Sequence, residues 1–190
     1  MLPSNNIAFK EWAVVCEALR AGQQTILLRK GGIEEGREGF CVKHREFWLL
    51  PTQFHQDASQ LKADARQLLD EVQSQKSPTE EFLIDLYAVV EAVFEIHDLA
   101  TLDRLAGEHI LSAETVHQRF DYRHPGLFVL AARIYRIPSP HDVHNSPYIA
   151  GCKSWVDLPQ PLSTLGAAPV LENDAFSKRL ERVTDLVRSL

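Results

Sequence analysis

The chain has 190 residues, of which 45% are hydrophobic and 24% are charged, and these values are typical of a folded globular protein rather than a disordered or fibrous one. Its formal net charge of −6 excludes a general attraction to nucleic acid or anionic lipid, so any such binding needs a local basic patch. The sequence has neither an apolar run long enough to cross a bilayer nor a secretory signal pattern at its start. We therefore expect a cytoplasmic protein without a membrane partner, forming one domain over residues 1–190.

The first third of the chain alternates apolar segments with polar connections. Residues 11–19 and 25–30 flank a short polar stretch that contains a glycine. This arrangement predicts a β-hairpin, although residues 11–19 also suit a short helix. A glycine-rich, charged loop over residues 31–39 then leads to a strand over residues 40–50, which we expect to end at Pro51.

Two longer segments follow, with different periodicities. Residues 57–75 place their apolar side chains on one helical face, which predicts an amphipathic helix with Leu61, Ala65, Leu68, Leu69 and Val72 toward the core. Residues 82–97 fit two patterns. A capping-box sequence over residues 77–80 and apolar spacing favour a helix, whereas strict alternation and β-branched residues favour a strand. We predict the strand.

The second half begins with two short helices. Asp98 is suited to cap a helix over residues 99–106, which a glycine would end. Ser112 is suited to cap a second helix that reaches about Phe120. Both predictions rest on side chains that accept a hydrogen bond from the first turn of a helix.

The remaining residues predict a central strand, an arm and a helix. Residues 127–137 are apolar on both faces, which predicts a central strand ended by Pro138. Residues 139–169 are rich in proline and show no sustained period, which predicts an irregular surface arm. Asn173 or Asp174 would then cap a C-terminal amphipathic helix.

Together these elements predict an α+β fold with a mixed or antiparallel sheet of about four to six strands. A long helix would follow Pro51, short helices would lie in the middle of the chain, and a helix would end it. The core should centre on the strand over residues 127–137, because both of its faces are apolar.

Basic residues suggest a first hypothesis, a nucleic-acid or nucleotide binding site. Arg29 and Lys30 precede two glycines, Gly31 and Gly32, and such a turn would bring cations and backbone amides to a phosphate, although a basic turn at the end of a strand is the commoner explanation. Residues 119–124 interleave arginines with aromatics, which suits phosphate pairing and base stacking. Alternatively, an aspartate within this run pairs with one arginine while the aromatic side chains pack. The candidate ligand-binding residues are Arg29, Lys30, Arg119, Arg123, Arg133 and Arg136.

A second hypothesis is an enzyme that acts on a small molecule in a pocket near Trp48, Thr52 and His55, because histidine suits proton transfer near neutral pH. Cys152 is a candidate nucleophile beside a lysine, although the three cysteines are far apart and read as free thiols. A third hypothesis is a protein-interaction module that uses the proline-rich arm and the C-terminal helix. The sequence contains no G-x-S-x-G, H-E-x-x-H or C-x-x-C motif, so it leaves open whether the protein is an enzyme.

Three residues in the second half of the sequence are candidate metal ligands. His141, His144 and Cys152 could bind zinc, but a fourth ligand at suitable spacing is missing. We therefore expect solvated loop histidines, no metal and no cofactor.

Six segments together carry a family resemblance, namely EWAVVCEAL, ILLRKGGI, FWLLPTQFHQ, HILSAETVHQRFDY, VLAARIYRIP and GCKSWVDLP. In this order they resemble the bacterial domain-of-unknown-function family eighteen-oh-two (DUF1802) and span the chain almost from end to end. Members are similar in carrying a tryptophan in the third helical segment, where this chain has Leu111. The resemblance implies an association with restriction-type nuclease domains, and so a role in DNA restriction or defence with a nuclease or another protein as partner.

Overall fold

The computed structural model describes residues 1–30, 44–54, 56–74, 81–151 and 153–189. Its elements in chain order are β1 (Ser4–Trp12), α1 (Ala13–Arg20), β2 (Ile26–Arg29), β3 (Glu46–Thr52), the 3-10 turns η1 (Ala58–Gln60) and η2 (Ala63–Ala65), α2 (Arg66–Ser74), β4 (Glu81–Ile96), α3 (Leu99–Arg104), η3 (Leu105–Glu108), α4 (Ala113–Asp121), β5 (Leu127–His144), α5 (Pro147–Ala150), β6 (Trp155–Ser163), β7 (Ala168–Pro169) and α6 (Asn173–Arg188). The predicted α+β fold class is confirmed.

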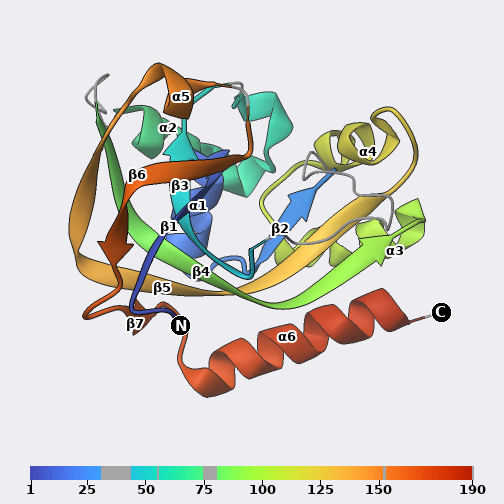
Figure 1. Ribbon diagram of the computed structural model, residues 1–190. Helices are drawn as coiled ribbons and strands as arrows, with labels where there is room; N and C mark the ends of the chain where they lie inside the picture. Colours follow the sequence, from blue (N-terminus) through green and yellow to red (C-terminus); the bar gives the residue numbers. More distant parts are fainter. Residues whose placement is uncertain (31–43, 55, 75–80, 152, 190) are drawn as a thin grey trace.

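One mixed sheet organises the chain, with the strand order β2-β5-β4-β3-β1-β6 and with β7 paired to β5. Its longest strands, β4 and β5, curve across the whole molecule in Figure 1, with α1 and α2 on the concave side and α6 along the convex side. Two clusters of buried side chains fill the fold, one that includes most of β2 and the first part of β5 and a smaller one around Trp48. No helix within the described ranges is both long and apolar enough to span a membrane.

The hairpin predicted over residues 11–30 is wrong. β1 continues to Trp12 and passes directly into α1, and it pairs in parallel with β3 and in antiparallel with β6. The helix alternative therefore holds for Ala13–Arg20, where Ala and Leu favour a helix and six side chains are buried. Gly22 then turns the chain toward β2 at a φ of 65°, which a residue without Cβ adopts at low cost.

The prediction that Pro51 ends its strand is also wrong. β3 runs through Pro51 to Thr52, and Pro51 pairs with Glu11 of β1. Only the first part of β3, Glu46 to Trp48, pairs with β4. Pro51 therefore lies where β3 has one neighbouring strand, and its missing N–H breaks no ladder on the other side.

The long helix predicted over residues 57–75 is shorter than expected. Asp57 forms a capping box with Gln60 that closes the turn η1, and Leu61 then bridges to Leu111, so α2 begins only at Arg66. Leu111 itself lies in this bridge and not in a helix. The tertiary pairing of Leu61 interrupts a segment whose periodicity alone suits one continuous helix.

Several predictions are confirmed. Residues 82–97 form a strand, β4, whereas the capping-box residues 77–80 lie outside the described residues. Asp98 caps α3 by accepting a hydrogen bond of 2.8 Å from the Thr101 amide, and Ser112 accepts one of 3.3 Å from the Thr115 amide at the start of α4. The C-terminal helix is α6, although its N-cap residue is Glu172, without a capping side chain, rather than Asn173 or Asp174.

The irregular arm predicted over residues 139–169 is wrong in most of its length. β5 does not stop at Pro138 but continues to His144, and β6 and β7 follow. The pairing of β4 with β5 jumps from Ile84 opposite His141 to Leu86 opposite Arg136. Residues 137–140, with both prolines, thus form a bulge, in which a missing N–H is tolerated.

Candidate nucleic-acid interface

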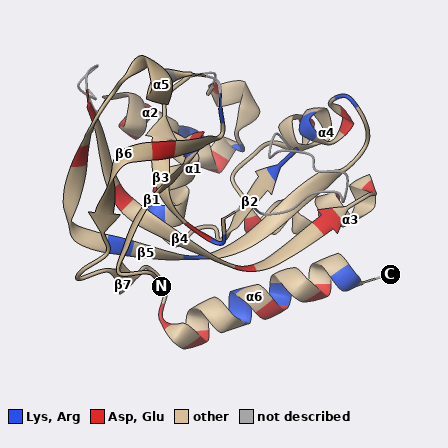
Figure 2. Cartoon of the chain, in the orientation of Figure 1, with Lys and Arg blue, Asp and Glu red and all other residues tan. Residues whose placement is uncertain are grey.

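Four of the six predicted basic residues gather where β2 ends and α4 ends. Arg29 is the last residue of β2, Lys30 follows it, and Arg119 and Arg123 lie in and just after the last turn of α4. In Figure 2, blue segments mark basic residues at the tip of β2 and on α4 with the turn behind it. We call this region the β2–α4 corner and define it by Trp12, Arg29, Lys30, Arg119, Tyr122 and Arg123.

Arg29 is held by three contacts at the end of β1. Its guanidinium lies 3.2 Å from Glu11 Oε2, donates to Ser154 Oγ at 2.8 Å and stacks 4.3 Å from the centroid of the Phe9 ring. Glu11 is only 3% exposed, and its other carboxylate oxygen accepts from the Trp12 amide at 2.8 Å. A buried carboxylate therefore positions Arg29 in one orientation.

Arg119 approaches the same carboxylate from α4 without a hydrogen bond to it. Its guanidinium carbon lies 4.5 Å from the centroid of the Trp12 ring, and Nη1 donates to the carbonyl of Leu28 at 3.2 Å. Burial lowers the pKa of Arg119, Arg29 lowers it further, and Glu11 opposes both. Arginine stays protonated at neutral pH, so two guanidinium groups share one carboxylate and the corner keeps a net positive charge.

Lys30 organises the turn behind α4. Its ammonium donates to the carbonyls of Phe120, His124 and, at 2.8 Å, Gly126. A cation at this place also offsets the negative end of the α4 dipole. The three contacts fix the backbone of the turn that carries the next two corner residues.

That turn presents an aromatic and a cation to solvent. Arg123 has a φ of 66°, a left-handed conformation that is uncommon for arginine and that the lysine contacts hold in place. Tyr122 is 58% exposed, and the Arg123 guanidinium lies 5.2 Å from the centroid of its ring. No ion pair joins Arg123 to another of the described residues, so its charge is available to a ligand.

Two buried donors beside the corner have no acceptor among the described residues. Gln56 accepts from the Val14 amide at 3.2 Å through Oε1, but its Nε2 has no hydrogen-bond partner in the described part of the chain. Trp155 packs 4.6 Å from the Phe9 ring, over which Arg29 also lies, and the same holds for its Nε1. Unpaired buried donors cost free energy unless a ligand or water accepts from them.

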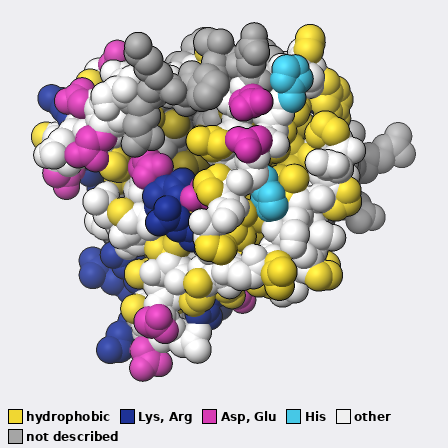
Figure 3. Space-filling view, turned by 90° about the vertical axis from the view of Figure 1, so that its left-hand side faces the viewer, with side chains coloured by type: hydrophobic (Ala, Val, Ile, Leu, Met, Phe, Trp, Pro, Cys, Tyr) yellow, Lys and Arg dark blue, Asp and Glu magenta, His cyan; other side chains and the backbone are white. Residues whose placement is uncertain are grey.

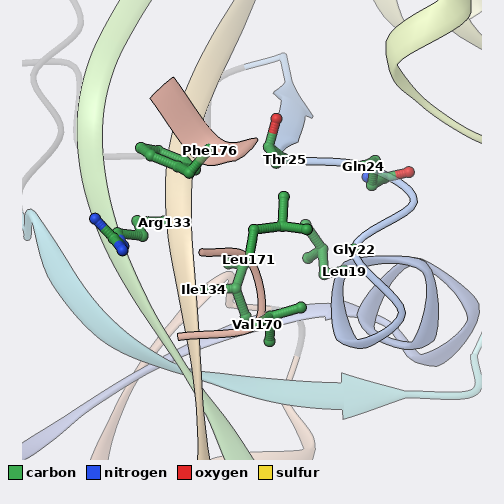
Figure 4. A pocket seen from close by; sticks show the side chains of 9 residues that line it. All are labelled: Leu19, Gly22, Gln24, Thr25, Arg133, Ile134, Val170, Leu171 and Phe176. Atoms are coloured by element: carbon green, nitrogen blue, oxygen red, sulfur yellow. The ribbon is translucent and has the colours of Figure 1, made fainter. Parts of the chain in front are cut away.

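The other two predicted arginines lie elsewhere. Arg133 contacts Asn173 Oδ1 and lies between the rings of Tyr135 and Phe176, at 5.6 and 5.4 Å from their centroids. Arg133 lines a water-sized cavity of about 10 Å³ under the start of α6. Figure 4 shows the other side chains that line this cavity. The Nε of Arg136 pairs with Asp85 Oδ2 at 3.3 Å. Neither of these two arginines is part of the corner.

Of the residues of the enzyme hypothesis, the structure describes Trp48 and Thr52. Trp48 is fully buried and donates to the carbonyl of Asn5 at 2.9 Å, so its ring does not wall a pocket open to solvent. Thr52 donates to the carbonyl of Glu11 at 3.1 Å. The predicted residues His55, Cys152, Gly31 and Gly32 lie outside the described residues.

The histidines considered for zinc have other surroundings. His141 Nε2 lies 2.9 Å from the carbonyl of Ser163, and its ring packs edge-on against Trp48. The part of the chain that the structure describes contains no group of three or more His, Cys, Asp or Glu side chains suited to hold a metal ion.

The surface of the interaction hypothesis is partly apolar. Figure 3 views the side of the molecule where β4 begins and β5 bends, and hydrophobic side chains cover much of it. Leu83 on β4 is 52% exposed, and Leu165 after β6 is 87% exposed.

Sequence reasoning missed Trp12, which belongs to the corner, and Glu11 and Ser154, which hold Arg29 there. The sequence carried one signal for Glu11. This residue lies two positions after Phe9, so both side chains lie on the same face of the strand, and a buried carboxylate there needs a cationic partner. The identity of that partner, Arg29, depends on the sheet order and is not encoded locally.

No curated protein matches the chain. Among solved structures it is similar to ASCH from Zymomonas mobilis, at 13% identity and a TM-score of 0.42 over 92% of this chain and 93% of that one. A serine-to-alanine variant of ZmASCH gives 14% identity and a TM-score of 0.43 over 95% and 98% of the two chains. The family model described as "Domain of unknown function (DUF1802)" matches residues 8–182, so the chain belongs to the DUF1802 family.

Proposed function

We propose that the protein binds single-stranded nucleic acid through the β2–α4 corner. The observation that carries this proposal is the arrangement of Arg29 and Arg119 around one buried carboxylate, Glu11, beside the Trp12 ring. Because two arginines lie around one carboxylate, the cluster keeps one uncompensated positive charge. A guanidinium fork is well suited to bind a phosphate. The corner therefore supplies a local basic patch on an acidic protein.

The exposed turn favours a single strand over a duplex. Tyr122 and Arg123 lie side by side and open to solvent, and an unpaired base can stack on such a pair while its phosphate meets the arginine. The bases of a duplex are already stacked and would leave this ring unused. We expect the phosphates to contact Arg123 first and the partly buried Arg29 and Arg119 next.

Fluorescence anisotropy at low salt tests the proposal with one labelled sequence as RNA, as single-stranded DNA and as duplex DNA. We expect binding to both single strands and weaker binding to the duplex. Removing one phosphate contact in Arg123→Ala should lower the salt slope of log K by about 0.7, and Tyr122→Ala should weaken binding about tenfold. Arg188→Ala, an equal charge change at the exposed end of α6, should alter neither. Absence of binding by all three probes, or equal effects of the three variants, overturns the proposal.

The family resemblance extends the proposal to a partner. A protein that holds a strand in this way would suit an accessory role beside a nuclease of a DNA restriction or defence system. Analytical ultracentrifugation of the purified protein with such a nuclease, in the presence and absence of DNA, tests this extension. Independent sedimentation in both conditions contradicts the partnership and leaves the nucleic-acid site to its own test.

A further inference from the structure

A second basic surface lies between η3 and α6, apart from the β2–α4 corner. An open depression with a volume of about 230 Å³ is lined there by Gly107, Glu108, Lys178, Arg179 and Arg182. The three cations stand at positions i, i+1 and i+4 of α6, which places them on neighbouring parts of one helix face. Figure 2 shows the corresponding basic bands along α6.

The charges of this depression do not balance. Arg182 Nε lies 2.7 Å from Glu108 Oε1, and Glu108 is only 3% exposed. Burial lowers the pKa of Lys62, and the charges of Asp64 and then of Glu108 oppose this effect. The one acidic side chain of the lining therefore acts on two cations, Arg182 and Lys62.

The other two cations have no acidic partner in the lining. Arg179 Nη1 donates to the carbonyl of Gln23 at 2.7 Å, which anchors the side chain but leaves its charge in place. Lys178 is exposed and forms no ion pair or hydrogen bond with another of the described residues. The depression therefore carries positive charge in excess of its one carboxylate.

Arg182 lies close to Gly107 at the rim of the depression. A Cβ at position 107 would lie 3.6 Å from Arg182 Nη2, which is an ordinary van der Waals distance. The Arg182 side chain is 66% exposed, and its Nε is held by Glu108. A guanidinium fork next to two further cations is suited to several anionic oxygens at once.

We propose that this depression binds a small anion with more than one phosphate group, of the class of inorganic diphosphate. Its volume of about 230 Å³ is below the range of about 300–1,000 Å³ that is usual for drug-sized ligands, and a diphosphate fits within it. The multiple charges of a diphosphate match the cluster better than the single phosphate of a nucleic-acid chain. This site does not depend on the function of the corner.

Isothermal titration calorimetry with inorganic diphosphate tests the proposal, with sulfate at equal ionic strength as the competing anion. We expect the wild-type protein to bind diphosphate more tightly than sulfate, and Lys178→Glu to weaken diphosphate binding at least about tenfold through the reversed charge. The matched control is Arg188→Glu, the same charge change on the same helix outside the lining, which should bind as the wild type does. Circular dichroism checks that both variants are folded.

An NMR spectrum of the backbone amides shows where diphosphate binds. Diphosphate should shift the Gly107 amide resonance in the wild-type protein and in Arg188→Glu, but not in Lys178→Glu. The proposal is overturned by an undetectable heat with diphosphate, by equal affinity for sulfate, by equal losses in both variants, or by resonance shifts that leave Gly107 unchanged.

Discussion

The guanidinium carbon of Arg119 lies 4.5 Å from the centroid of the Trp12 ring, and this contact joins α4 to the last residue of β1. Because the same guanidinium donates to the carbonyl of Leu28 in β2, one side chain connects three elements. The guanidinium is thereby held beside Trp12, where its charge interacts with Glu11 and Arg29.

Replacing Arg119 with lysine separates the contribution of its charge to binding from that of its planar guanidinium. Arg119→Lys keeps one positive charge but loses the planar face and the fork of donors. We expect the affinity for single-stranded nucleic acid to fall about tenfold with little change in salt slope, since the number of cations is unchanged. Fluorescence anisotropy over a salt series measures both. Arg188→Lys, at an exposed position, is the control, and unchanged affinity in Arg119→Lys would show that charge alone matters.

Lys30 is expected to act through the turn that it holds. Lys30→Met keeps the length of the side chain but removes the donor to the carbonyls of Phe120, His124 and Gly126. We expect the free energy of unfolding to fall by about 1–2 kcal/mol, because the contacts are charged but partly open to water. Amide hydrogen exchange should speed up in residues 121–126 more than in β4.

The control for this prediction is Lys153→Met. Lys153 is exposed and lies 5.6 Å from the Tyr148 ring, so its removal takes away charge without releasing the turn. Equal exchange rates in residues 121–126 for Lys30→Met and for the wild type would contradict the positioning role.

The elements that sequence predicts correctly are those decided within a few residues. Asp98 and Ser112 each accept a hydrogen bond from an amide three residues ahead, and apolar residues recur at every second position of β4 from Ile84 to Ile96. The incorrect predictions concern segments whose structure depends on contacts with residues distant in the sequence. The parallel pairing of β1 with β3 turns an expected hairpin into a strand and a helix, and the bridge from Leu61 to Leu111 shortens α2.

The candidate site divides in the same way. The arginine-rich run of residues 119–124 is visible in the sequence as composition, whereas its contact with Trp12 depends on how α4 docks against the sheet. Arg133 and Arg136 share that composition but point to α6 and Asp85 instead. The strand register therefore determines which arginines lie close together. The sequence alone does not reveal this register.

Asp85 on β4 links two arginines across the sheet. Its side chain is only 7% exposed and accepts from Nη1 and, at 2.7 Å, from Nη2 of Arg20, and it also pairs with Arg136. Asp85→Ala should lower the free energy of unfolding by about 2 kcal/mol, because it leaves the partly buried Arg20 with Glu17 alone, at 2.9 Å from its Nε, as a carboxylate partner. Urea denaturation measures the change.

Arg136→Ala is the comparison variant for Asp85. The Arg136 side chain is 60% exposed, and an exposed ion pair contributes at most about 1 kcal/mol. We therefore expect the Arg136 variant to lose much less stability than the Asp85 variant. Equal losses would mean that Arg136, and not Arg20, is the partner that matters.

His109 gives the protein a pH-dependent stability. Burial, followed by the charges of Lys62 and Arg119, lowers the pKa of His109 to about 3, and its Nδ1 has no partner among the described residues. In the unfolded chain the pKa is about 6.5, so between these two values the unfolded state binds one proton more than the folded state. Stability therefore rises with pH across this window and is lost as the pH falls from about 6.5 toward about 3.

His109→Gln removes this proton and should flatten the dependence. We expect wild-type stability to fall by up to about 1.4 kcal/mol for each pH unit relative to the variant, measured by urea denaturation between about pH 7 and about pH 4.5, above the range in which the carboxylates of Asp57 and Asp98 are titrated. His97→Gln is the matched control, because the His97 side chain is 71% exposed and its replacement should leave the slope unchanged. Parallel slopes for the wild type and His109→Gln would show that His109 is protonated in the folded protein, which a side chain enclosed by Lys62 and Arg119 should resist.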